Sequence, residues 1–461
     1  MNVLVIGSGG REHAICWALR KSPRISKLYC APGNGGISQI AECVDIKAVD
    51  IEGIVNYCKE NTSIDFVVVA PDDPLVLGMV DALEAAGIRT FGPRGNAAII
   101  EGSKSFSKNL MKTHGIPTAE YEEFTDADEA AAYIRSKGAP IVVKADGLAL
   151  GKGVIVAEKT EDALKAVDDM MRSKSFGESG SRVVVEEFMT GAEVTVLAFT
   201  DGRTIIPMLS SQDHKRALTG DKGLNTGGMG AFCPSPIYTD EIAETCMRTI
   251  YKPTIDAMNA SGRKFKGVIY FGLMLTSSGP RVVEYNARFG DPETQPILSL
   301  LETDLLDIFE AIVDERLDEI DIKWRDGYAC CVVIASGGYP SSYETGFEIT
   351  GLDDVPEDIT VFHAGTIVGV DGTTPDGETT LRGMTTQDGV TVQRGETALD
   401  GVTTLSGNEG YLTNGGRVLG VTAMGNTLES ASARAYEGAE LIKFKNAYYR
   451  TDIGRKPTYI N

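Results

Sequence analysis

The stretch VVKADGLALGKGV, from Val142 to Val154, places an apolar strand pattern, a lysine and a glycine-rich loop directly after one another. The apolar run predicts a buried strand, and we expect Lys144 within it to be buried and not a surface lysine. A lysine meets phosphate as a point charge, and a loop such as Gly151, Lys152 and Gly153 offers backbone N–H groups to a polyphosphate. The stretch therefore predicts one half of an ATP site.

The other half is expected far downstream, in RVVEYNARFGDPETQ from Arg281 to Gln295. Glu284 and Asn286 are two residues apart on a predicted strand, so their side chains point to one face. A carboxylate and an amide oxygen on one face suit an oxygen-ligated magnesium ion that bridges phosphates. The alternative is a pair of solvent-facing positions on an amphipathic strand. Together the two halves predict phosphoryl transfer.

The composition limits the size of the domains and the kind of partner. A chain of 461 residues exceeds a single hydrophobic core and predicts about three domains. The formal net charge of -21 argues against a nucleic-acid or anionic-membrane partner, because both require a basic face. An anionic substrate must then be bound by a local cluster of basic side chains.

The cysteines and the hydropathy pattern indicate the compartment. The eight cysteines show no Cys-x-x-Cys pair and no histidine spacing suited to zinc, so we expect buried small hydrophobes in a reducing cytosol. The sequence starts directly with the strand-like residues Val3 to Ile6, and no apolar run approaches the roughly 20 residues of a membrane helix. These features predict a soluble, cytoplasmic protein.

Short apolar strands alternate with helical stretches along residues 1–101, as they do in βαβ units. This pattern predicts a small N-terminal α/β domain built on a parallel sheet. The expected strands are Val3–Ile6, Leu28–Ala31, Phe66–Ala70 and Arg89–Phe91.

The first turn of this domain, GSGGREH from Gly7 to His13, partly matches the dinucleotide motif G-x-G-x-x-G. The third glycine of that motif falls at Glu12, and no acidic residue ends the second strand to hold an adenine ribose, which argues against a nicotinamide cofactor. The turn instead predicts a helix N-terminus that binds one phosphate of a smaller ligand through Gly9, Gly10 and Arg11. The alternative is a tight strand-to-helix turn without a ligand.

Residues 102–323 contain both halves of the ATP site and predict a central domain with a mobile, glycine-rich lid at about 122–188. Two strands are expected near the end of this lid, at Arg182–Phe188 and Val194–Thr200. The first of them ends in two glutamates and a phenylalanine. This strand end suits contacts to the edge of an adenine.

Residues 210–232, SSQDHKRALTGDKGLNTGGMGAF, form a long polar segment in which Asp213, His214, Lys215 and Arg216 are adjacent. We expect an irregular loop here, because long glycine-rich segments with little intrinsic structure are usually functional or disordered. The charge cluster and the Thr-Gly-Gly turn favour a substrate-binding loop over plain disorder.

The last part of the chain, residues 324–461, is expected to form a mixed, β-rich domain with a strand at Tyr328–Ala335 and a helix from about Leu428. An insert at about 367–412 interrupts this domain. Within it GETTLRGMTT recurs as GETALDGVTT, and the Asp-Gly turns favour surface hairpins or, alternatively, a disordered tract.

Motifs along nearly the whole chain make it similar to the phosphoribosylamine-glycine ligases, or glycinamide ribonucleotide synthetases, of the ATP-grasp superfamily. Their number and order make the resemblance specific. The motifs are VLVIGSGGREHA, APGNGG, EGSKSF, GIPTAEY, GAPIVVKADGLALGKGVIVA, VVEEF, SQDHKR, NTGGMGA, EYNARFGDPETQP, SGGYP, FHAGT and TNGGRVLGVTA.

The resemblance implies an α/β and α+β multidomain fold with a parallel N-terminal domain, central ATP-grasp domains and a mixed C-terminal domain. It implies that ATP, glycine and 5-phosphoribosylamine give glycinamide ribonucleotide, ADP and phosphate, the second step of purine synthesis. A glycyl phosphate would form first, because a free carboxylate is a poor acyl donor. ATP would be the cosubstrate, Mg²⁺ or Mn²⁺ the metal, and the protein a monomer or small homo-oligomer.

The resemblance also implies roles for individual residues. ATP binding is implied for Lys104, Lys144, Gly147, Gly151, Lys152, Gly153, Glu186, Glu187, Phe188, Met189 and Glu193, and metal ligation for Glu284 and Asn286. Arg288, Lys144 and Asp213 are the expected catalytic residues, with Arg288 offsetting charge on the moving phosphoryl group. The substrate side comprises Gly9, Gly10, Arg11, Asp72, Asp213, Lys215, Arg216, Arg288 and Asp291. His13 and His214 are expected to orient or hydrogen-bond, not to act as general bases.

Three features depart from the family pattern. Many ATP-grasp enzymes carry a further metal carboxylate on the preceding strand, whereas Lys266–Pro280 has no acidic residue. Asp72 stands where the family usually has glutamate, which shortens the side chain by one methylene. The insert exceeds the expected hairpin by about forty residues, a length that loop entropy tolerates.

Two other functions are alternatives. One is another ATP-grasp carboxylate-amine ligase or carboxylase of purine or biotin-dependent metabolism, and the SQDHKR and NTGGMGA motifs argue against it. The other is a nucleotide-responsive binding protein that does not catalyse. The presence of Lys144, Glu284, Asn286 and Arg288 together argues against the second alternative.

Overall fold

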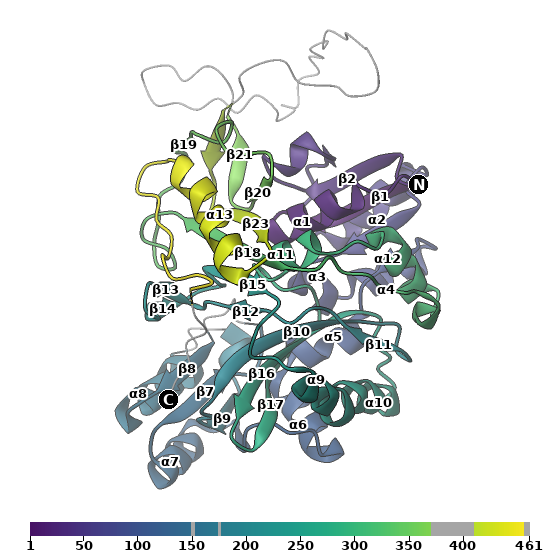
Figure 1. Cartoon of the computed structure of the whole chain (residues 1–461). Coiled ribbons are helices and arrows are strands. Elements are labelled where there is room, and N and C mark those ends of the chain that lie inside the picture. The colour runs from purple at the N-terminus through teal and green to yellow at the C-terminus, as the bar shows by residue number, and fades with distance from the viewer. Residues whose placement is uncertain (149–152, 174–176, 370–409, 456–461) are drawn as a thin grey trace, which may run out of the picture.

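The N-terminal part of the chain is built on a five-stranded parallel sheet in the order β3-β2-β1-β4-β5 (Figure 1). The computed structural model describes residues 1–148, 153–173, 177–369 and 410–455. All four predicted strands are present, and β3 is an additional short edge strand. The elements are β1 (Asn2–Gly7), α1 (Gly10–Leu19), β2 (Lys27–Pro32), β3 (Glu42–Cys43), α2 (Ile51–Glu60), β4 (Phe66–Val69), α3 (Asp72–Val76), α4 (Met79–Ala85), β5 (Thr90–Phe91) and α5 (Gly95–Gly102).

The strand order reverses at β1, which pairs in parallel with β2 on one side and β4 on the other. In open parallel sheets, ligands bind at the carboxyl ends of the strands next to such a reversal. The turn after β1 carries Gly9 and Gly10, and α3 begins with Asp72 shortly after β4. Two segments predicted to bind substrate therefore lie at the same edge of this sheet.

A four-stranded antiparallel sheet in the order β6-β9-β7-β8 lies at one end of the molecule, at the lower left of Figure 1. It packs against two helices and has an apolar core of its own, which includes Ile134, Val143 and Val185. The strand predicted around Lys144 is confirmed as β7. The elements are β6 (Tyr121–Phe124), α7 (Ala127–Lys137), β7 (Ile141–Ala145), β8 (Val154–Ala157), α8 (Thr160–Val167) and β9 (Val183–Glu187).

The central antiparallel sheet has the order β11-β10-β16-β17. Its register places Glu284 opposite Gly272 and Asn286 opposite Tyr270, with a bulge after Gly272. A Cβ atom on Gly272 would lie 3.2 Å from Glu284 Cγ, so the glycine gives room to the glutamate side chain. The elements are α6 (Lys104–His114), β10 (Ala192–Thr200), β11 (Ile205–Pro207), α9 (Asp240–Cys246), α10 (Lys252–Ala260), β16 (Gly267–Thr276) and β17 (Gly279–Asn286).

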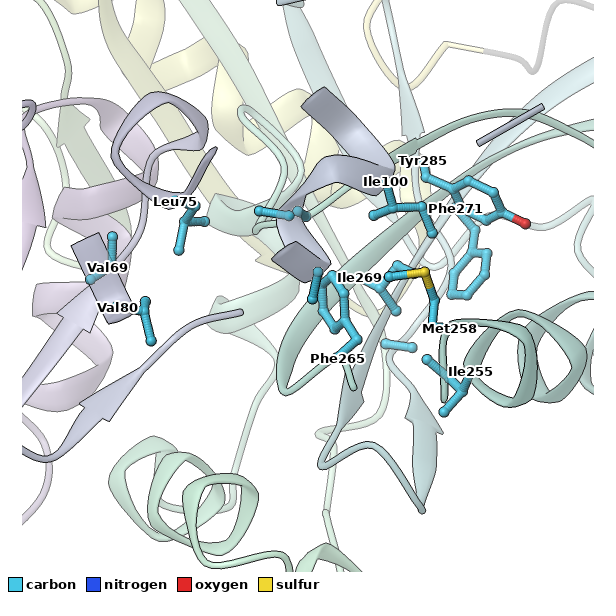
Figure 2. Close-up of a cluster of buried hydrophobic side chains, with 14 of the residues drawn as sticks. Val69, Leu75, Val80, Ile100, Ile255, Met258, Phe265, Ile269, Phe271 and Tyr285 are labelled. Atoms are coloured by element: carbon cyan, nitrogen blue, oxygen red, sulfur yellow. The ribbon is translucent and has the colours of Figure 1, made fainter. Parts of the chain in front are cut away.

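One buried apolar cluster joins the N-terminal sheet to the central sheet (Figure 2). Val69 and Leu75 come from the N-terminal part, and Ile100 comes from α5. Phe265 and Phe271 come from the central part, and both are fully buried. Burying side chains of this size stabilises each by about 1.5–3 kcal/mol, so the cluster holds the two parts in one arrangement.

The C-terminal part is built on the antiparallel sheet β12-β15-β18-β23-β20, with α13 packed against β18 and β23. The predicted strand at Tyr328–Ala335 is confirmed as β18, and the predicted helix is confirmed as α13. The elements are α11 (Thr294–Ser299), α12 (Leu305–Val313), β18 (Tyr328–Ala335), β20 (Ile359–His363), β23 (Arg417–Gly425) and α13 (Leu428–Leu441).

The prediction of an irregular loop at residues 210–232 is wrong, because most of this segment is paired as strand. β13 and β14 form a hairpin whose turn has Gly220 and Asp221 at φ of 74° and 53°. β15 pairs with β18, a partner far along the chain that local composition does not reveal. The strands are β12 (Gln212–Asp213), β13 (Arg216–Leu218), β14 (Lys222–Asn225) and β15 (Gly230–Cys233).

The insert leaves and re-enters the fold between two paired strands, β21 (Thr366–Val368) and β22 (Tyr411–Thr413). These strands form a small sheet with β19 (Glu348–Ile349). Gly369 N donates to Gly410 O at 2.6 Å, so the two ends of the insert meet. The repeat itself lies outside the described residues.

Seven of the eight cysteines are buried, as predicted, but Cys43 is exposed and the prediction is wrong for it. Cys43 lies on β3, a two-residue strand at the edge of the N-terminal sheet, where no further strand covers it. Among the helices of the described ranges, none is long and apolar enough to cross a membrane.

Candidate active site

The strand β7 carries Lys144 into the interior, where β17 of the central sheet approaches it. Lys144 is 4% exposed, which confirms that it is buried and is not a surface lysine. Its Nζ donates to Val283 O at 3.1 Å and lies 2.9 Å from Glu186 Oε1 on β9. Val283 directly precedes Glu284. The structure therefore brings together the two segments that were predicted to form the ATP site.

Lys104 begins α6 beside the glycine-rich segment. Ser103 caps this helix by accepting a hydrogen bond from Phe106 N at 3.1 Å, which fixes the position of the first turn. Lys104 Nζ donates to Gly147 O at 3.0 Å. Burial lowers the pKa of Lys104, and the nearby Glu284 carboxylate opposes that effect. Lys104 and Lys144 thus supply two cations beside Glu284.

The glycine-rich segment is anchored at both of its described ends. At the first end, Asp146 Oδ1 accepts a hydrogen bond from Ser103 Oγ at 3.0 Å. At the other end, Gly153 O accepts from Ala145 N at 2.8 Å. The predicted phosphate-binding residues Gly151 and Lys152 lie outside the described residues.

The residues predicted to contact adenine lie at the end of β9. Glu186 is 3% exposed, whereas Phe188 is 39% exposed and Met189 is half-buried. The Glu187 carboxylate pairs with Arg281 near the start of β17, the strand that carries Glu284 and Asn286. This end of the lid sheet is therefore fixed to the central sheet, with the exposed Phe188 beside it.

Glu284 and Asn286, the predicted metal ligands, both lie on β17 and carry side-chain oxygens. Lys215 Nζ lies 3.7 Å from Glu284 Oε1, and Asn286 Oδ1 accepts from Arg288 Nη2 at 3.2 Å. Burial opposes ionisation of Glu284, but Lys215 and further cations outweigh it, so its pKa is lowered and it stays charged. The described parts of the chain hold no group of three His, Cys, Asp or Glu side chains that could bind a metal ion, so Glu284 and Asn286 would hold such an ion together with nucleotide phosphates.

Arg288 is held from three sides. Its Nη2 lies 3.1 Å from Glu101 Oε1, and its Nη1 donates to Phe289 O at 3.2 Å. Glu101 also accepts a hydrogen bond from Ala287 N at 2.7 Å through its second oxygen. Burial raises the pKa of Glu101, and the Arg288 charge opposes that rise. The arrangement fixes the guanidinium beside Asn286.

Sequence reasoning missed Glu101. The EGSKSF motif contains it, but its partner Ala287 is 186 positions further along the chain. A glutamate at the end of a helix, as Glu101 is in α5, is usually an exposed residue. Only the fold reveals that it is 7% exposed and holds the arginine.

A group of carboxylates surrounds Lys215, of which Glu293 is buried, Asp213 and Glu284 are partly buried and Glu193 is exposed. Lys215 Nζ lies 3.1 Å from Glu193 Oε2, and the Tyr270 hydroxyl donates to Glu293. Burial raises the pKa of Asp213 to about 7, and burial also raises the pKa of Glu293. The positive charge nearby is therefore too small to keep Asp213 and Glu293 fully ionised. An additional cationic group would suit this cluster of acids. Glu293 lies in the GDPETQ motif but received no predicted role.

Arg216, predicted on the substrate side, makes its contacts within the β13–β14 hairpin. Its Nη1 donates to Gly223 O at 2.8 Å. Its carbonyl accepts from Arg450 Nη1 at 3.0 Å, and Arg450 also pairs with Asp221 at 2.8 Å. Arg216 thus stabilises the hairpin next to Lys215.

The turn after β1 is closed by its own glutamate. Gly9 N donates to Glu12 Oε2 at 2.6 Å, and Arg11 Nε donates to Glu12 Oε1 at 2.6 Å. Arg11 is 8% exposed, and its Nη1 donates to Phe289 O at 3.1 Å, next to Arg288. Burial opposes ionisation of Asp72, but Arg288 and Arg11 outweigh it and lower its pKa. The structure thus brings the N-terminal edge to the central site.

Asp291 connects this turn to the C-terminal part. Arg417 Nη2 lies 3.0 Å from Asp291 Oδ2, and Arg417 Nη1 donates to Gly227 O at 2.7 Å. A Cβ on Gly10 would lie 2.7 Å from Gln295 Nε2, so the amide of Gln295 packs closely against this turn. Sequence reasoning missed Arg417, because its motif shows no charge partner nearby.

Known proteins resemble the chain over its whole length. The phosphoribosylglycinamide synthetase models match in succession: the N domain over residues 1–101, the ATP-grasp (A) domain over 102–294 and the C domain over 329–456. The phosphoribosylamine-glycine ligase of Halalkalibacterium halodurans is 45% identical over 456 residues, which are 99% of this chain and 97% of that protein. The chain belongs to the phosphoribosylglycinamide synthetase family. The resemblance predicted from the motifs is confirmed.

Further relatives agree with this membership. The phosphoribosylamine-glycine ligase of Rhizobium meliloti is 45% identical over 98% of both chains. The crystal structure of the Thermotoga maritima phosphoribosylamine-glycine ligase superposes with a TM-score of 0.77 and 30% identity, and it covers 98% of this chain and 100% of that chain. The chain is therefore an ATP-dependent ligase with an ATP-grasp domain, and the predicted fold class is confirmed.

The fold extends beyond the ligases. The biotin carboxylase domain of the Hydrogenobacter thermophilus 2-oxoglutarate carboxylase superposes with a TM-score of 0.67 over 97% of this chain and 91% of that chain. The two sequences are 15% identical, so this likeness concerns the fold alone. The contrast with the 45% identity to the glycine ligases argues against the carboxylase alternative.

Proposed function

We propose that the chain joins glycine to 5-phosphoribosylamine and converts ATP to ADP and phosphate, giving glycinamide ribonucleotide. The observation that carries this proposal is the meeting of two unlike subsites at β17. Lys104, Lys144 and Arg288 supply cations for a polyphosphate, while the partly buried Asp213 and the buried Glu293 supply acids next to Lys215. Glycine requires both, because it carries a carboxylate to be phosphorylated and an ammonium group to be held.

The ammonium group of glycine is assigned to Asp213 and Glu293. Burial raises the pKa of Asp213 to about 7, so the carboxyl is partly protonated at neutral pH. A bound ammonium would restore its charge, since an opposite charge within about 4–6 Å favours the ionised form. Tyr270, which donates to Glu293, keeps that carboxylate in place.

The reaction needs two displacements. A carboxylate oxygen of glycine attacks the γ-phosphorus, the bond to the β-phosphate oxygen breaks, and ADP leaves. The amine of phosphoribosylamine then attacks the carbonyl carbon of glycyl phosphate, phosphate leaves, and the new amide nitrogen loses a proton. Lys144 and Arg288 act by offsetting charge on the moving phosphoryl group, and Glu101 positions Arg288.

The metal is assigned to Glu284 and Asn286. The residues fit, because Glu284 stays ionised and both offer oxygen, the ligand that Mg²⁺ or Mn²⁺ prefers. When bound, such an ion would neutralise phosphate charge. Lys104 and Lys144 bind the remaining phosphate oxygens.

The phosphoribosylamine is assigned to the N-terminal edge. Gly9, Gly10 and Arg11 begin α1 there, and a helix N-terminus favours a phosphate. Asp72 and Asp291 face Arg11 and are placed to accept hydrogen bonds from ribose hydroxyls. We propose domains at 1–101, 102–323 and 324–461, a lid at about 122–188, a cytoplasmic location and a monomer or small homo-oligomer.

A coupled ADP-release assay tests the proposal. ADP release should require both glycine and freshly made phosphoribosylamine. One glycine should be incorporated into product for each ADP released. ADP release that depends on bicarbonate or formate in place of glycine would support another ATP-grasp ligase or carboxylase. ATP binding without turnover under all these conditions would support a binding protein.

A further inference from the structure

The Glu186 carboxylate has two cationic partners, and one of them has no role so far. Lys144 Nζ lies 2.9 Å from Oε1, and Lys108 Nζ lies 2.9 Å from Oε2. The three residues are 3%, 4% and 2% exposed, so solvent does not screen them. A buried carboxylate that loses its partner is strongly unfavourable, so each lysine matters to Glu186.

Lys108 is held in place by more than the ion pair. It lies on α6 one turn after Lys104, and side chains four residues apart project to one side of a helix. Lys108 Nζ donates to Thr118 Oγ1 at 2.8 Å, and Thr118 Oγ1 donates to Val282 O at 2.7 Å. This chain of bonds ties Glu186 on the lid sheet to the strand that carries the metal ligands.

Lys144 and Lys108 differ in how readily each can leave Glu186. Lys144 is assigned to an ATP phosphate, and a phosphate competes with Glu186 for the same ammonium group. Lys108 pairs with the other oxygen of Glu186 and is fixed by Thr118. Burial lowers the pKa of Lys108 to about 8, so most of the side chain is still charged at neutral pH. Glu186 therefore keeps one cation when Lys144 turns to phosphate.

We propose that Lys108 is a positioning residue of the ATP site, which holds Glu186 oriented for the adenine and leaves Lys144 to the phosphates. This inference rests on the proposed roles of Glu186 and Lys144, but not on the identity of the acceptor substrates. A fixed carboxylate accepts from the 6-amino group of adenine and repels the 6-oxo group of guanine. Lys108 thus also contributes to the preference for ATP over GTP.

The test measures nucleotide binding by the full chain with magnesium, using calorimetry. Lys108→Met should raise the Kd for ATP by about 10- to 100-fold, the range expected for loss of a charge-assisted contact, and should narrow the ATP-to-GTP preference. The KM for glycine should stay within about threefold, because the glycine subsite lies beyond β17. An ATP Kd within twofold of wild type would overturn the proposal.

Lys112→Met is the matched control. Lys112 lies one further turn along α6, is exposed, and has its Nζ 5.3 Å from the Tyr121 ring, compared with 5.8 Å for Lys108. The control removes a lysine near the same ring without touching Glu186 and should bind ATP as wild type does. If Lys112→Met weakens ATP binding as much as Lys108→Met does, the effect comes from the surface of α6 and not from Glu186, which would contradict the proposal.

A double-mutant cycle with Glu186→Gln separates positioning from packing. If Lys108 acts through Glu186, the double variant should bind ATP no more weakly than the worse single variant, because neither side chain is left as an unpaired charge. Additive losses would overturn the proposal. Lys108→Arg keeps the cation and should bind ATP within about threefold of wild type. If Lys108→Met does not fold, the double variant is compared with Glu186→Gln alone: equal ATP Kd values support the proposal, and weaker binding by the double variant overturns it.

The two proposals fail in different ways. ATP binding needs no acceptor, so a wild-type chain that binds ATP but does not consume glycine refutes the proposed reaction and leaves the role of Lys108 standing. A wild-type chain that makes the proposed product, with unchanged ATP binding in Lys108→Met, refutes the role of Lys108 alone.

Discussion

Replacing Glu101 with glutamine tests how Arg288 is held, the arginine that we propose offsets charge on the moving phosphoryl group. The carboxylate has one oxygen 3.1 Å from Arg288 Nη2, and the other accepts from Ala287 N at 2.7 Å. Breaking a buried ion pair costs about 3–5 kcal/mol. The amide oxygen of glutamine retains one hydrogen bond, and Asp72 remains near Arg288, so we expect a smaller loss of about 1.5–3 kcal/mol.

This loss should appear in the chemical step. Because about 1.4 kcal/mol corresponds to a factor of ten in rate, Glu101→Gln should lower kcat by about 10- to 100-fold. The KM for ATP should change little, since the contacts of Lys104 to Gly147 and of Lys144 to Val283 do not involve Glu101. A kcat effect without a KM effect indicates an interaction that matters in the transition state.

The pH dependence provides a second reading. Burial raises the pKa of Glu101, so the folded wild type takes up this proton at a higher pH than an ordinary glutamate does. Protonation removes the charge opposite Arg288, and kcat should fall on the acid side for that reason. Glu101→Gln should lack this acid limb and have a flat, low kcat over the same range. The raised pKa also means that the contribution of Glu101 to stability is present at low pH and is lost as the pH rises.

The assay is coupled ADP release, with thermal melts of each variant. Glu84→Gln is the control, because Glu84 pairs with Arg94, whose side chain is 60% exposed, and such surface pairs contribute about 0–1 kcal/mol. The control should keep wild-type kcat. If Glu101→Gln folds normally and keeps kcat within twofold, then either Arg288 does not offset phosphoryl charge or Glu101 does not hold it.

Three further outcomes are expected. Glu284→Gln should slow turnover by on the order of a hundredfold at saturating magnesium while ATP still binds, and wild-type turnover would exclude Glu284 from the metal site. Burial lowers the pKa of His13 to about 3 and of His363 to about 4, so the free energy of unfolding should fall as the pH drops from about 6.5 towards 4. In urea unfolding at pH 7 and pH 5, the free energy of unfolding of His13→Gln should fall less between the two pH values than that of the wild type. An equal fall in both proteins would refute the role of this histidine pair. Replacing residues 371–408 with an Asn-Gly turn should leave turnover within about threefold, because β21 and β22 already meet; a folded variant with more than tenfold lower turnover would refute this.

Elements that depend on local sequence signals were predicted, whereas elements that depend on contacts between distant parts of the chain were not. β18 and the start of α13 were predicted to the residue, because an unbroken apolar run and the beginning of a helical pattern are local signals. The hairpin at 216–225 was not predicted. Arg450 Nη1 hydrogen-bonds to Arg216 O at 3.0 Å and pairs with Asp221 at 2.8 Å, and this partner lies more than two hundred residues later.

The candidate site shows the same division. Lys144, Glu284 and Asn286 could be predicted because each stands in a strand pattern with a defined face. Glu101 and Arg417 could not, because their function depends on partners across domain junctions, Ala287 and Asp291. The residues that we propose contact substrate stand in sequence motifs, whereas the partners that hold them in place are revealed only by the fold.

The pairing of charges also explains how an acidic chain can bind two phosphorylated substrates. Several cations of the site have carboxylate partners: Lys144 with Glu186, Lys215 with Glu193, Arg288 with Glu101 and Arg417 with Asp291. Lys104 instead donates to the carbonyl of Gly147. The net charge of -21 is therefore compatible with a basic site, since these cations are local and fixed. Fixed cations need little reorganisation when phosphate charge moves, which is the condition under which electrostatic stabilisation of a transition state is largest. Removing the Glu101 partner of Arg288 should thus impair catalysis more than it weakens substrate binding.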